Sequence, residues 1–136
     1  MGKIRVLLDT NVVLDFFTGR MNDGVAARIV QVGRSSPFEM CISFLTAINT
    51  MYVARKMNAA ISPSDISSLF SILPQDGQQW TDAGTLDMPD FEDATQAACA
   101  LRNQCFIVIS RDRHFDRAPM SVIAPERFLS LVSGGE

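Results

Sequence analysis

The segment Ile4-Arg5-Val6-Leu7-Leu8-Asp9-Thr10-Asn11 decides the fold class, because it places a carboxylate directly after a short apolar run. A mostly aliphatic run of this length, bounded by a polar turn, is typical of a strand that is buried on both faces. A helical pattern starts at Asn11, so Asp9 is expected at the C-terminal tip of the first strand. Open α/β sheets build their binding sites at such tips.

The rest of the chain alternates between strand and helix patterns. Leu45, Ile48 and Tyr52 recur at helical spacing, and Ser62-Pro63-Ser64-Asp65 is a helix start that we expect to lead a helix through Leu73. Strands are predicted at 4–8, 38–43, 105–109 and 121–123, helices at 11–18, 25–32, 44–57, 63–73, 91–102 and 125–132, a helical turn at 81–86, and an irregular segment with room for a short strand at 74–80. This order indicates right-handed crossovers and a mostly parallel sheet with helices on both faces.

Size and composition indicate one globular domain. The chain has 136 residues, of which 47% are hydrophobic and 20% charged. We assign residues 1–132 to a single domain and expect a disordered tail at 133–136. No pattern typical of a signal peptide or a membrane span is present, so we expect a cytoplasmic protein without membrane partners. The formal charge of −3 gives no overall field that attracts nucleic acid.

Three cysteines, Cys41, Cys99 and Cys105, form neither a CxxC motif nor a Cys/His ligand spacing. We interpret them as small core residues.

Further acids occupy positions that resemble that of Asp9. Asp90 and Asp93 open an alanine-rich helix and share one face of it, and Asp112 follows the apolar run that ends at Ile109. Acids are also common at helix starts, where the helix dipole favours them. Because parallel strands end at the same edge of a sheet, however, we expect these carboxylates to converge.

Converging carboxylates repel one another, and a bound cation removes that conflict. Oxygen ligands without a cysteine or histidine cluster favour Mg²⁺ or Mn²⁺ over zinc. Such an ion polarises a phosphoryl oxygen and lowers the pKa of bound water, so the pattern indicates phosphodiester hydrolysis. His114 is the only histidine, and we interpret it as a loop residue near the substrate rather than as a member of a catalytic triad. The chain contains no glycine-rich phosphate loop of the Rossmann or Walker type.

In order and spacing, these segments resemble the PIN-domain family of metal-dependent ribonucleases, which includes the VapC-like toxins. The motifs that carry the resemblance are Val6-Leu7-Leu8-Asp9-Thr10-Asn11-Val12, Asp93-Ala94-Thr95-Gln96-Ala97-Ala98-Cys99-Ala100, Ile107-Val108-Ile109-Ser110-Arg111-Asp112, and Val122-Ile123-Ala124-Pro125-Glu126-Arg127-Phe128-Leu129. Resemblance to this family implies a three-layer α/β sandwich with a central sheet of four to five strands.

The resemblance also implies a site. Asp9, Asp93 and Asp112 would be catalytic and, with Asp90, would bind Mg²⁺ or Mn²⁺. The family commonly has a glutamate where this chain has Asn49, so the site is expected to have lost one charge. Residues expected to support the ligands or to contact the substrate are Thr10, Asn11, Asn49, Ser110, Arg111, Arg113 and Asp116. Arg117 belongs to the same basic cluster as Arg111 and Arg113, which would position an RNA backbone.

The function that the resemblance implies is metal-dependent endoribonuclease activity, as in the toxin of a toxin–antitoxin pair. RNA would be the substrate, an antitoxin protein would be a partner, and the chain would form a homodimer through its N-terminal helices. Two alternatives stay open. Asn49 and the net acidity are compatible with a PIN-like module that binds protein or RNA without catalysis, and the same scaffold could cleave structured DNA.

Overall fold

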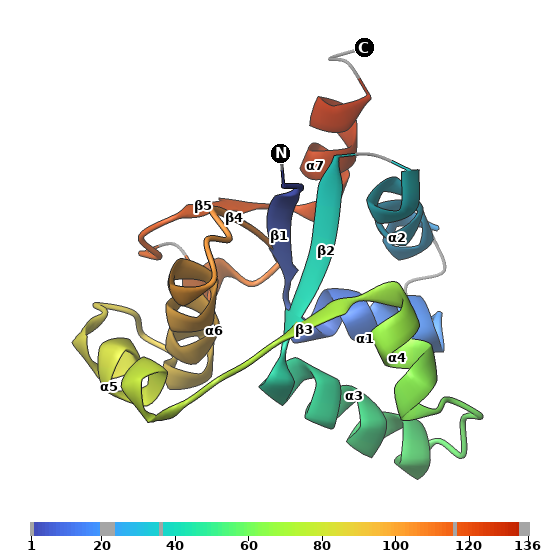
Figure 1. Ribbon diagram of the computed structural model, residues 1–136, viewed down its shortest axis with the longest axis horizontal. Coiled ribbons are helices and arrows are strands. Elements are labelled where there is room, and N and C mark those ends of the chain that lie inside the picture. The colour runs from blue at the N-terminus through green and yellow to red at the C-terminus, as the bar shows by residue number, and fades with distance from the viewer. Residues whose placement is uncertain (1, 20–23, 36, 116, 134–136) are drawn as a thin grey trace.

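A parallel sheet lies at the centre of the molecule, and helices pack around it (Figure 1). The structure is a computed structural model that describes residues 2–19, 24–35, 37–115 and 117–133. Its elements are β1 (Ile4–Leu8), α1 (Thr10–Thr18), α2 (Val25–Ser35), β2 (Phe38–Ser43), α3 (Phe44–Lys56), α4 (Pro63–Leu69), β3 (Ser71–Leu73), α5 (Gly77–Thr85), α6 (Phe91–Arg102), β4 (Ile107–Ile109), a 3₁₀ turn η1 (Arg113–Phe115), β5 (Ser121–Ile123) and α7 (Pro125–Val132).

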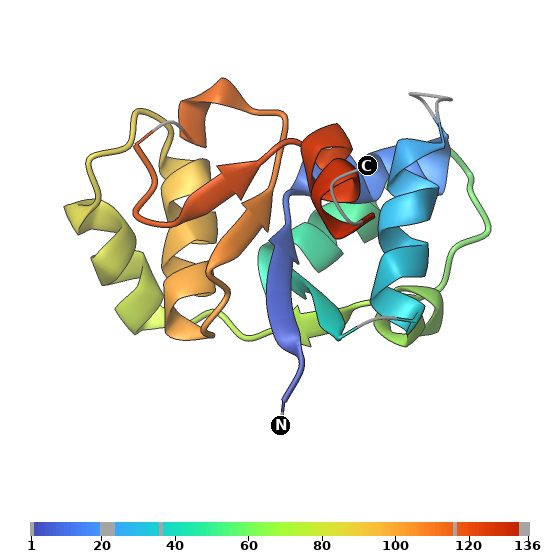
Figure 2. The same ribbon diagram turned by 90° about the horizontal axis from the view of Figure 1, so that it is seen from above.

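The sheet has five strands in the order β3-β2-β1-β4-β5, and every neighbouring pair is parallel. The predicted α/β fold with helices on both faces is therefore confirmed. Figure 2 shows α5 and α6 on one side of the strands and α2 on the other. Among the described residues, none of the helices has the length and apolar character that a bilayer crossing requires.

Alternation along β1 explains how the sheet separates two layers. Val6 and Leu8 face a core formed with α1, α2, α3, α4 and α7, whereas Leu7 faces α6 and η1. Cys41, Cys99 and Cys105 are buried with Leu7 and form no disulfide, which confirms their interpretation as small core residues.

The start of α4 follows the sequence prediction. Ser62 accepts a hydrogen bond from the backbone of Asp65, and the Asp65 carboxylate accepts one from the backbone of Ser62. This reciprocal capping satisfies two backbone donors that the first helical turn leaves open.

Two predictions between α4 and α6 were wrong. The helix from Pro63 ends at Leu69, and Ser71–Leu73 is an edge strand beside β2, because pairing with Cys41, Ile42 and Ser43 overrides the helical periodicity. The next helix begins at Gly77 rather than at residue 81, because Asp76 caps it by accepting from the backbone of Gln79.

The expected disordered tail begins with Ser133, which the structure describes as a turn, and continues through 134–136, which lie outside the described residues.

Candidate metal centre

Asp9 lies where the sequence placed it, between the end of β1 and the start of α1. Leu8 pairs with Ile109, so the residues that follow these two strands, Asp9 and Ser110, are neighbours. The Asp9 carboxylate accepts hydrogen bonds from the backbone of Thr10 and from the hydroxyl of Ser110, both at 2.8 Å. Only 5% of Asp9 is exposed, and burial raises its pKa although both bonds oppose the rise.

Asp112 belongs to the same edge and is linked to Asp9 through Ser110. The Ser110 hydroxyl accepts the backbone N–H of Asp112 at 2.9 Å while it donates to Asp9. One Asp112 oxygen accepts the backbone N–H of His114 at 2.8 Å and lies 3.1 Å from the His114 Nδ1. These bonds fix the loop after β4 and hold the Asp112 carboxylate close to the other acids.

Asp90 and Asp93 bring the N-terminus of α6 to this edge. Asp90 caps the helix by accepting the backbone N–H of Asp93 at 3.0 Å. Asp93 is buried, and its Oδ2 has no hydrogen-bond partner among the described residues. The pKa of Asp93 is raised to about 8, mainly by burial and further by the hydrogen bond and negative charge of Asp112 and the charges of Asp90 and Asp9.

The donor set fits a hard divalent cation. Asp9, Asp93 and Asp112 are close enough for their charges to perturb one another, and a buried carboxylate oxygen without a partner is costly in the absence of a ligand. A cation placed there would satisfy that oxygen and allow the carboxylates to ionise together. The expected convergence of the acids is thus present in the fold.

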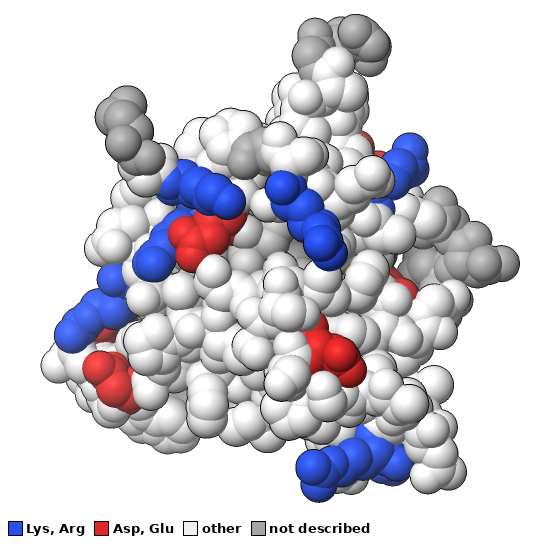
Figure 3. All heavy atoms as spheres, turned by 45° about the vertical axis from the view of Figure 1, so that its right-hand side comes forward, with Lys and Arg blue, Asp and Glu red and all other residues white. Residues whose placement is uncertain are grey.

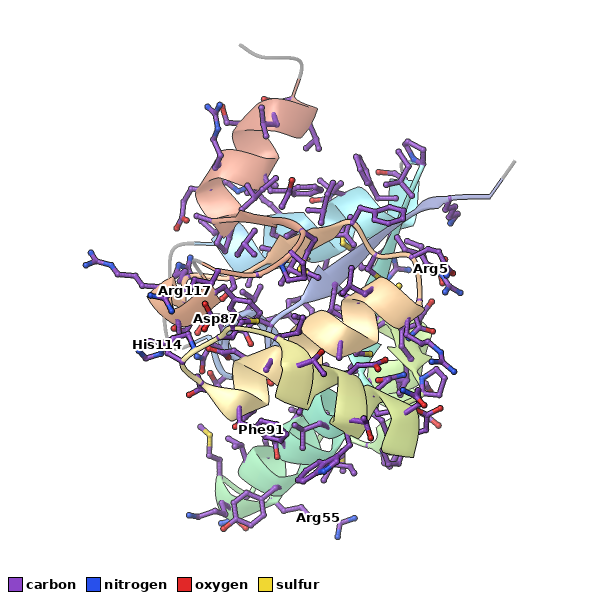
Figure 4. All side chains as sticks on the ribbon, turned by 90° about the vertical axis from the view of Figure 1, so that its left-hand side faces the viewer. Arg5, Arg55, Asp87, Phe91, His114 and Arg117 are labelled. Atoms are coloured by element: carbon purple, nitrogen blue, oxygen red, sulfur yellow. The ribbon has the colours of Figure 1, made fainter. Side chains whose placement is uncertain are left out.

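Sequence reasoning did not count His114 among the ligands. One ligand atom each from Asp90, Asp93 and His114 lie within 4.8 Å of one another, although the His114 side chain is 63% exposed. The only signal in the sequence was its position two residues after Asp112. His114 thus adds a nitrogen ligand atom beside two of the acids. Figure 4 shows His114 at the edge of the molecule.

Asn49, the amide at the usual glutamate position, is half-buried on α3. No hydrogen bond joins its side chain to the acids among the described residues. One turn earlier, the hydroxyl of Thr46 meets that of Thr10 at 2.8 Å. Thr10 therefore supports Asp9 through its backbone, and its side chain connects α1 to α3. Asn11 is exposed on the first turn of α1.

The arginines after β4 lie in different surroundings. Arg111 binds Asp15 at 2.7 Å and Glu126 at 2.8 Å, and so joins α1 to α7. Arg113 is exposed on η1, and the exposed Arg117 lies 3.4 Å from Asp87 (Figure 4). Asp116 lies outside the described residues. On the face shown in Figure 3, basic side chains form separate groups rather than one continuous surface.

A comparison with protein families identifies the fold. The model of the PIN domain matches residues 5–114, which include all four acids of the cluster. This chain belongs to the PIN-domain family. A curated relative of this PIN domain is ribonuclease VapC1 of Aquifex aeolicus (strain VF5), which is 25% identical over 137 residues, 94% of this chain and 95% of the relative.

Solved structures share the architecture of this PIN domain. A toxin–antitoxin complex from Klebsiella pneumoniae superimposes with a TM-score of 0.68 at 24% identity and covers 88% of this chain and 97% of that one. VapBC-1 from nontypeable Haemophilus influenzae gives 0.65 at 15% identity, with 90% and 98% covered. VapBC2 from Rickettsia felis, bound to a promoter DNA fragment, gives 0.64 at 14%, with 88% and 98% covered. At these low identities, the TM-scores show a shared fold.

Proposed function

We propose that this PIN domain is a Mg²⁺- or Mn²⁺-dependent endoribonuclease. The observation that carries the proposal is the unpartnered Oδ2 of Asp93, buried in a cluster where Asp9 and Asp112 also supply carboxylates. Asp90 and His114 border the same space. Such a set of hard donors, with one oxygen left open, suits a divalent cation that acts on a phosphodiester.

Asp9, Asp93 and Asp112 would hold the ion, with Asp90 at its side. A bound divalent cation supplies positive charge that polarises the phosphodiester and makes an attacking water more acidic. Ser110 keeps one Asp9 oxygen in place, and the Thr10 backbone keeps the other. Attack by water would leave a 5′-phosphate and a 3′-hydroxyl on the products.

RNA as substrate is supported by the homology to a protein named as a ribonuclease. An unpaired segment of RNA would suit the site, because unstacked strands bring a phosphate within reach of buried acids. The exposed Arg113 would contact the RNA backbone next to that phosphate. A solved structure with the same fold, from Klebsiella pneumoniae, is a toxin–antitoxin complex, which supports an antitoxin partner, and we also expect a homodimer.

A second function, RNA or protein binding without catalysis, is favoured by one observation. Asn49 supplies no charge where the family commonly has a glutamate, so fewer anionic ligands surround the cluster. The remaining acids would then bind a cation weakly or not at all.

Cleavage of RNA by the purified protein, with Mn²⁺ or Mg²⁺ and with a chelator, separates the two functions. We expect cleavage only with metal and its loss in Asp93→Asn, which keeps the shape of the side chain but removes its charge. Asp82→Asn is the matched control, because Asp82 lies on α5 and its side chain accepts a bond from Gln78 of the same helix. If the wild-type protein does not bind metal and does not cleave RNA, the result would support the second function, binding without catalysis.

A further inference from the structure

A chain of buried polar groups connects three helices next to the acidic cluster. The Thr46 hydroxyl on α3 lies 3.1 Å from the Gln96 Nε2 on α6, 3.2 Å from the Ser43 hydroxyl and 2.8 Å from the Thr10 hydroxyl on α1. Thr46, Gln96 and Ser43 are each at most 1% exposed. Thr10 is half-buried and adjoins Asp9.

The numbers of donors and acceptors on these groups determine which group donates in each hydrogen bond. A hydroxyl has one hydrogen and two acceptor sites, and an amide nitrogen can only donate. Gln96 Nε2 and the Ser43 hydroxyl both donate to Thr46 and fill its two acceptor sites. The single Thr46 hydrogen must therefore point to the Thr10 oxygen.

This direction sets the orientation of Thr10. Because the Thr10 oxygen accepts a hydrogen bond from Thr46, the hydrogen of the Thr10 hydroxyl cannot also point toward Thr46. No acceptor for this hydrogen occurs among the described residues, although the side chain stands one residue from Asp9. The hydrogen is thus available to an acceptor that a substrate brings.

We infer that Gln96 is a positioning residue which, through Thr46, aims the Thr10 hydroxyl hydrogen at an oxygen of the phosphodiester. This inference rests on the proposed nuclease function and adds two residues, Gln96 and Thr46, to its machinery. A phosphodiester fits because its oxygens only accept hydrogen bonds and carry the charge that a hydroxyl donor stabilises.

The burial of Gln96 agrees with a directional role. Its Oε1 has no partner among the described residues, so the amide is buried with half of its bonding capacity unused. An apolar side chain would pack in the same space without leaving a polar atom unsatisfied. The bond that Gln96 does make is the one that orients Thr46.

The test compares Gln96→Leu, Thr46→Val, Thr10→Val and the double variant Gln96→Leu/Thr10→Val in metal-dependent RNA cleavage. Removal of one preorganised donor to a reacting phosphate lowers kcat by about a hundredfold, which we expect for Thr10→Val. Gln96→Leu and Thr46→Val remove only its orientation, so we expect losses of about tenfold in kcat with little change in KM. Thr10→Ser keeps the hydroxyl and should retain most of the activity.

Gln79→Leu is the matched control. Gln79 is also buried and also makes one bond through Nε2, to the Pro74 carbonyl. Its Oε1 likewise has no partner in the described part of the chain. It lies on α5 outside the polar chain, so Gln79→Leu should lower the melting temperature without changing kcat. A purely structural Gln96 would behave in the same way.

The comparison of the double variant with the single variants tests the inference most directly. If Gln96 acts through Thr10, the double variant is no slower than Thr10→Val alone. Losses that multiply, or a Gln96→Leu variant with wild-type kcat, overturn this inference while the nuclease function stands. Wild-type protein without metal-dependent cleavage overturns both. If Gln96→Leu does not fold, the isosteric Thr46→Val and the contrast between Thr10→Val and Thr10→Ser decide the question.

Discussion

Ser110 donates its hydroxyl to Asp9 Oδ2 at 2.8 Å, and the two residues follow strands β4 and β1 at the point where Ile109 pairs with Leu8. This bond lowers the pKa of Asp9 against the effect of burial. The same hydroxyl accepts the backbone of Asp112, so one serine orients two of the acids.

Ser110→Ala is expected to weaken metal-dependent cleavage. Asp9 loses a donor, its pKa rises further, and more alkaline conditions are needed to ionise it. We expect a loss of activity that is greater at lower pH and is partly recovered as pH increases, and a loss of stability of about 1 kcal/mol. A pH–rate profile beside that of Ser121→Ala, an exposed serine on β5, provides the measurement. An unshifted profile would show that Ser110 does not tune Asp9.

Metal-free protein is expected to lose stability as pH rises from about 4 to about 8. In this window folded Asp93, with its pKa raised from 3.8 to about 8, retains a proton that the unfolded chain has released. The folded state then binds more protons than the unfolded state, so its free energy of unfolding decreases with increasing pH. Melting temperatures in a chelator should fall across the window for wild type and Asp82→Asn, and fall less for Asp93→Asn. Equal slopes in all three would contradict the assignment.

Mn²⁺ is expected to raise the melting temperature, and to do so more strongly at about pH 8 than at about pH 6. The ion must displace the proton from Asp93, so binding strengthens as that proton becomes easier to remove. At about one hundred times its Kd the ion adds about 2.7 kcal/mol to the free energy of unfolding. Calorimetry in two buffers of different ionisation enthalpy measures the proton release. Binding without proton release would place the ion away from Asp93.

Asn49→Glu is expected to tighten Mn²⁺ binding by about tenfold, because it supplies the carboxylate that the family commonly has and each opposite charge at close range favours the bound ion. In metal-free protein the added charge should destabilise the fold slightly, since it repels the other acids. Gln31→Glu adds the same charge on the exposed face of α2 and serves as the control. Equal affinities in the two variants would leave Asn49 as a surface residue of α3.

Arg111 and Arg113 are expected to act differently despite their proximity in sequence. Arg111→Met removes the guanidinium that joins Asp15 to Glu126 and should destabilise the protein by about 2 kcal/mol. Arg113→Ala should leave the melting temperature unchanged, weaken RNA binding and reduce its salt dependence. Binding titrations at several salt concentrations, beside thermal melts, separate the two effects. A salt-dependent loss in Arg111→Met at unchanged stability would reverse the assignment.

Much of the site was predictable because it depends on strand ends. An apolar run followed by Asp9 or by Ser110-Arg111-Asp112 fixes where each acid stands along its own strand. Parallel pairing then brings these ends to one edge whatever the details of packing. The position of Asp93 was predictable as well, because the sequence shows that a helix starts just before it. By contrast, the proximity of His114 to Asp90 and Asp93 depends on the course of the loop through η1, which no periodicity records.

The sequence by itself determined the alternation of β1, α1, β2, α3, α6 and β4, and with it a parallel sheet edge lined by acids, because the pattern of apolar residues and the helix caps act locally. Tertiary structure alone decided that Ser71–Leu73 is a strand, that Arg111 joins Asp15 to Glu126, and that Gln96 reaches Thr46. The Gln96–Thr46 bond spans 50 residues of the chain. Contacts of this kind arise only when separate elements pack together, and local sequence patterns do not specify which polar groups then meet.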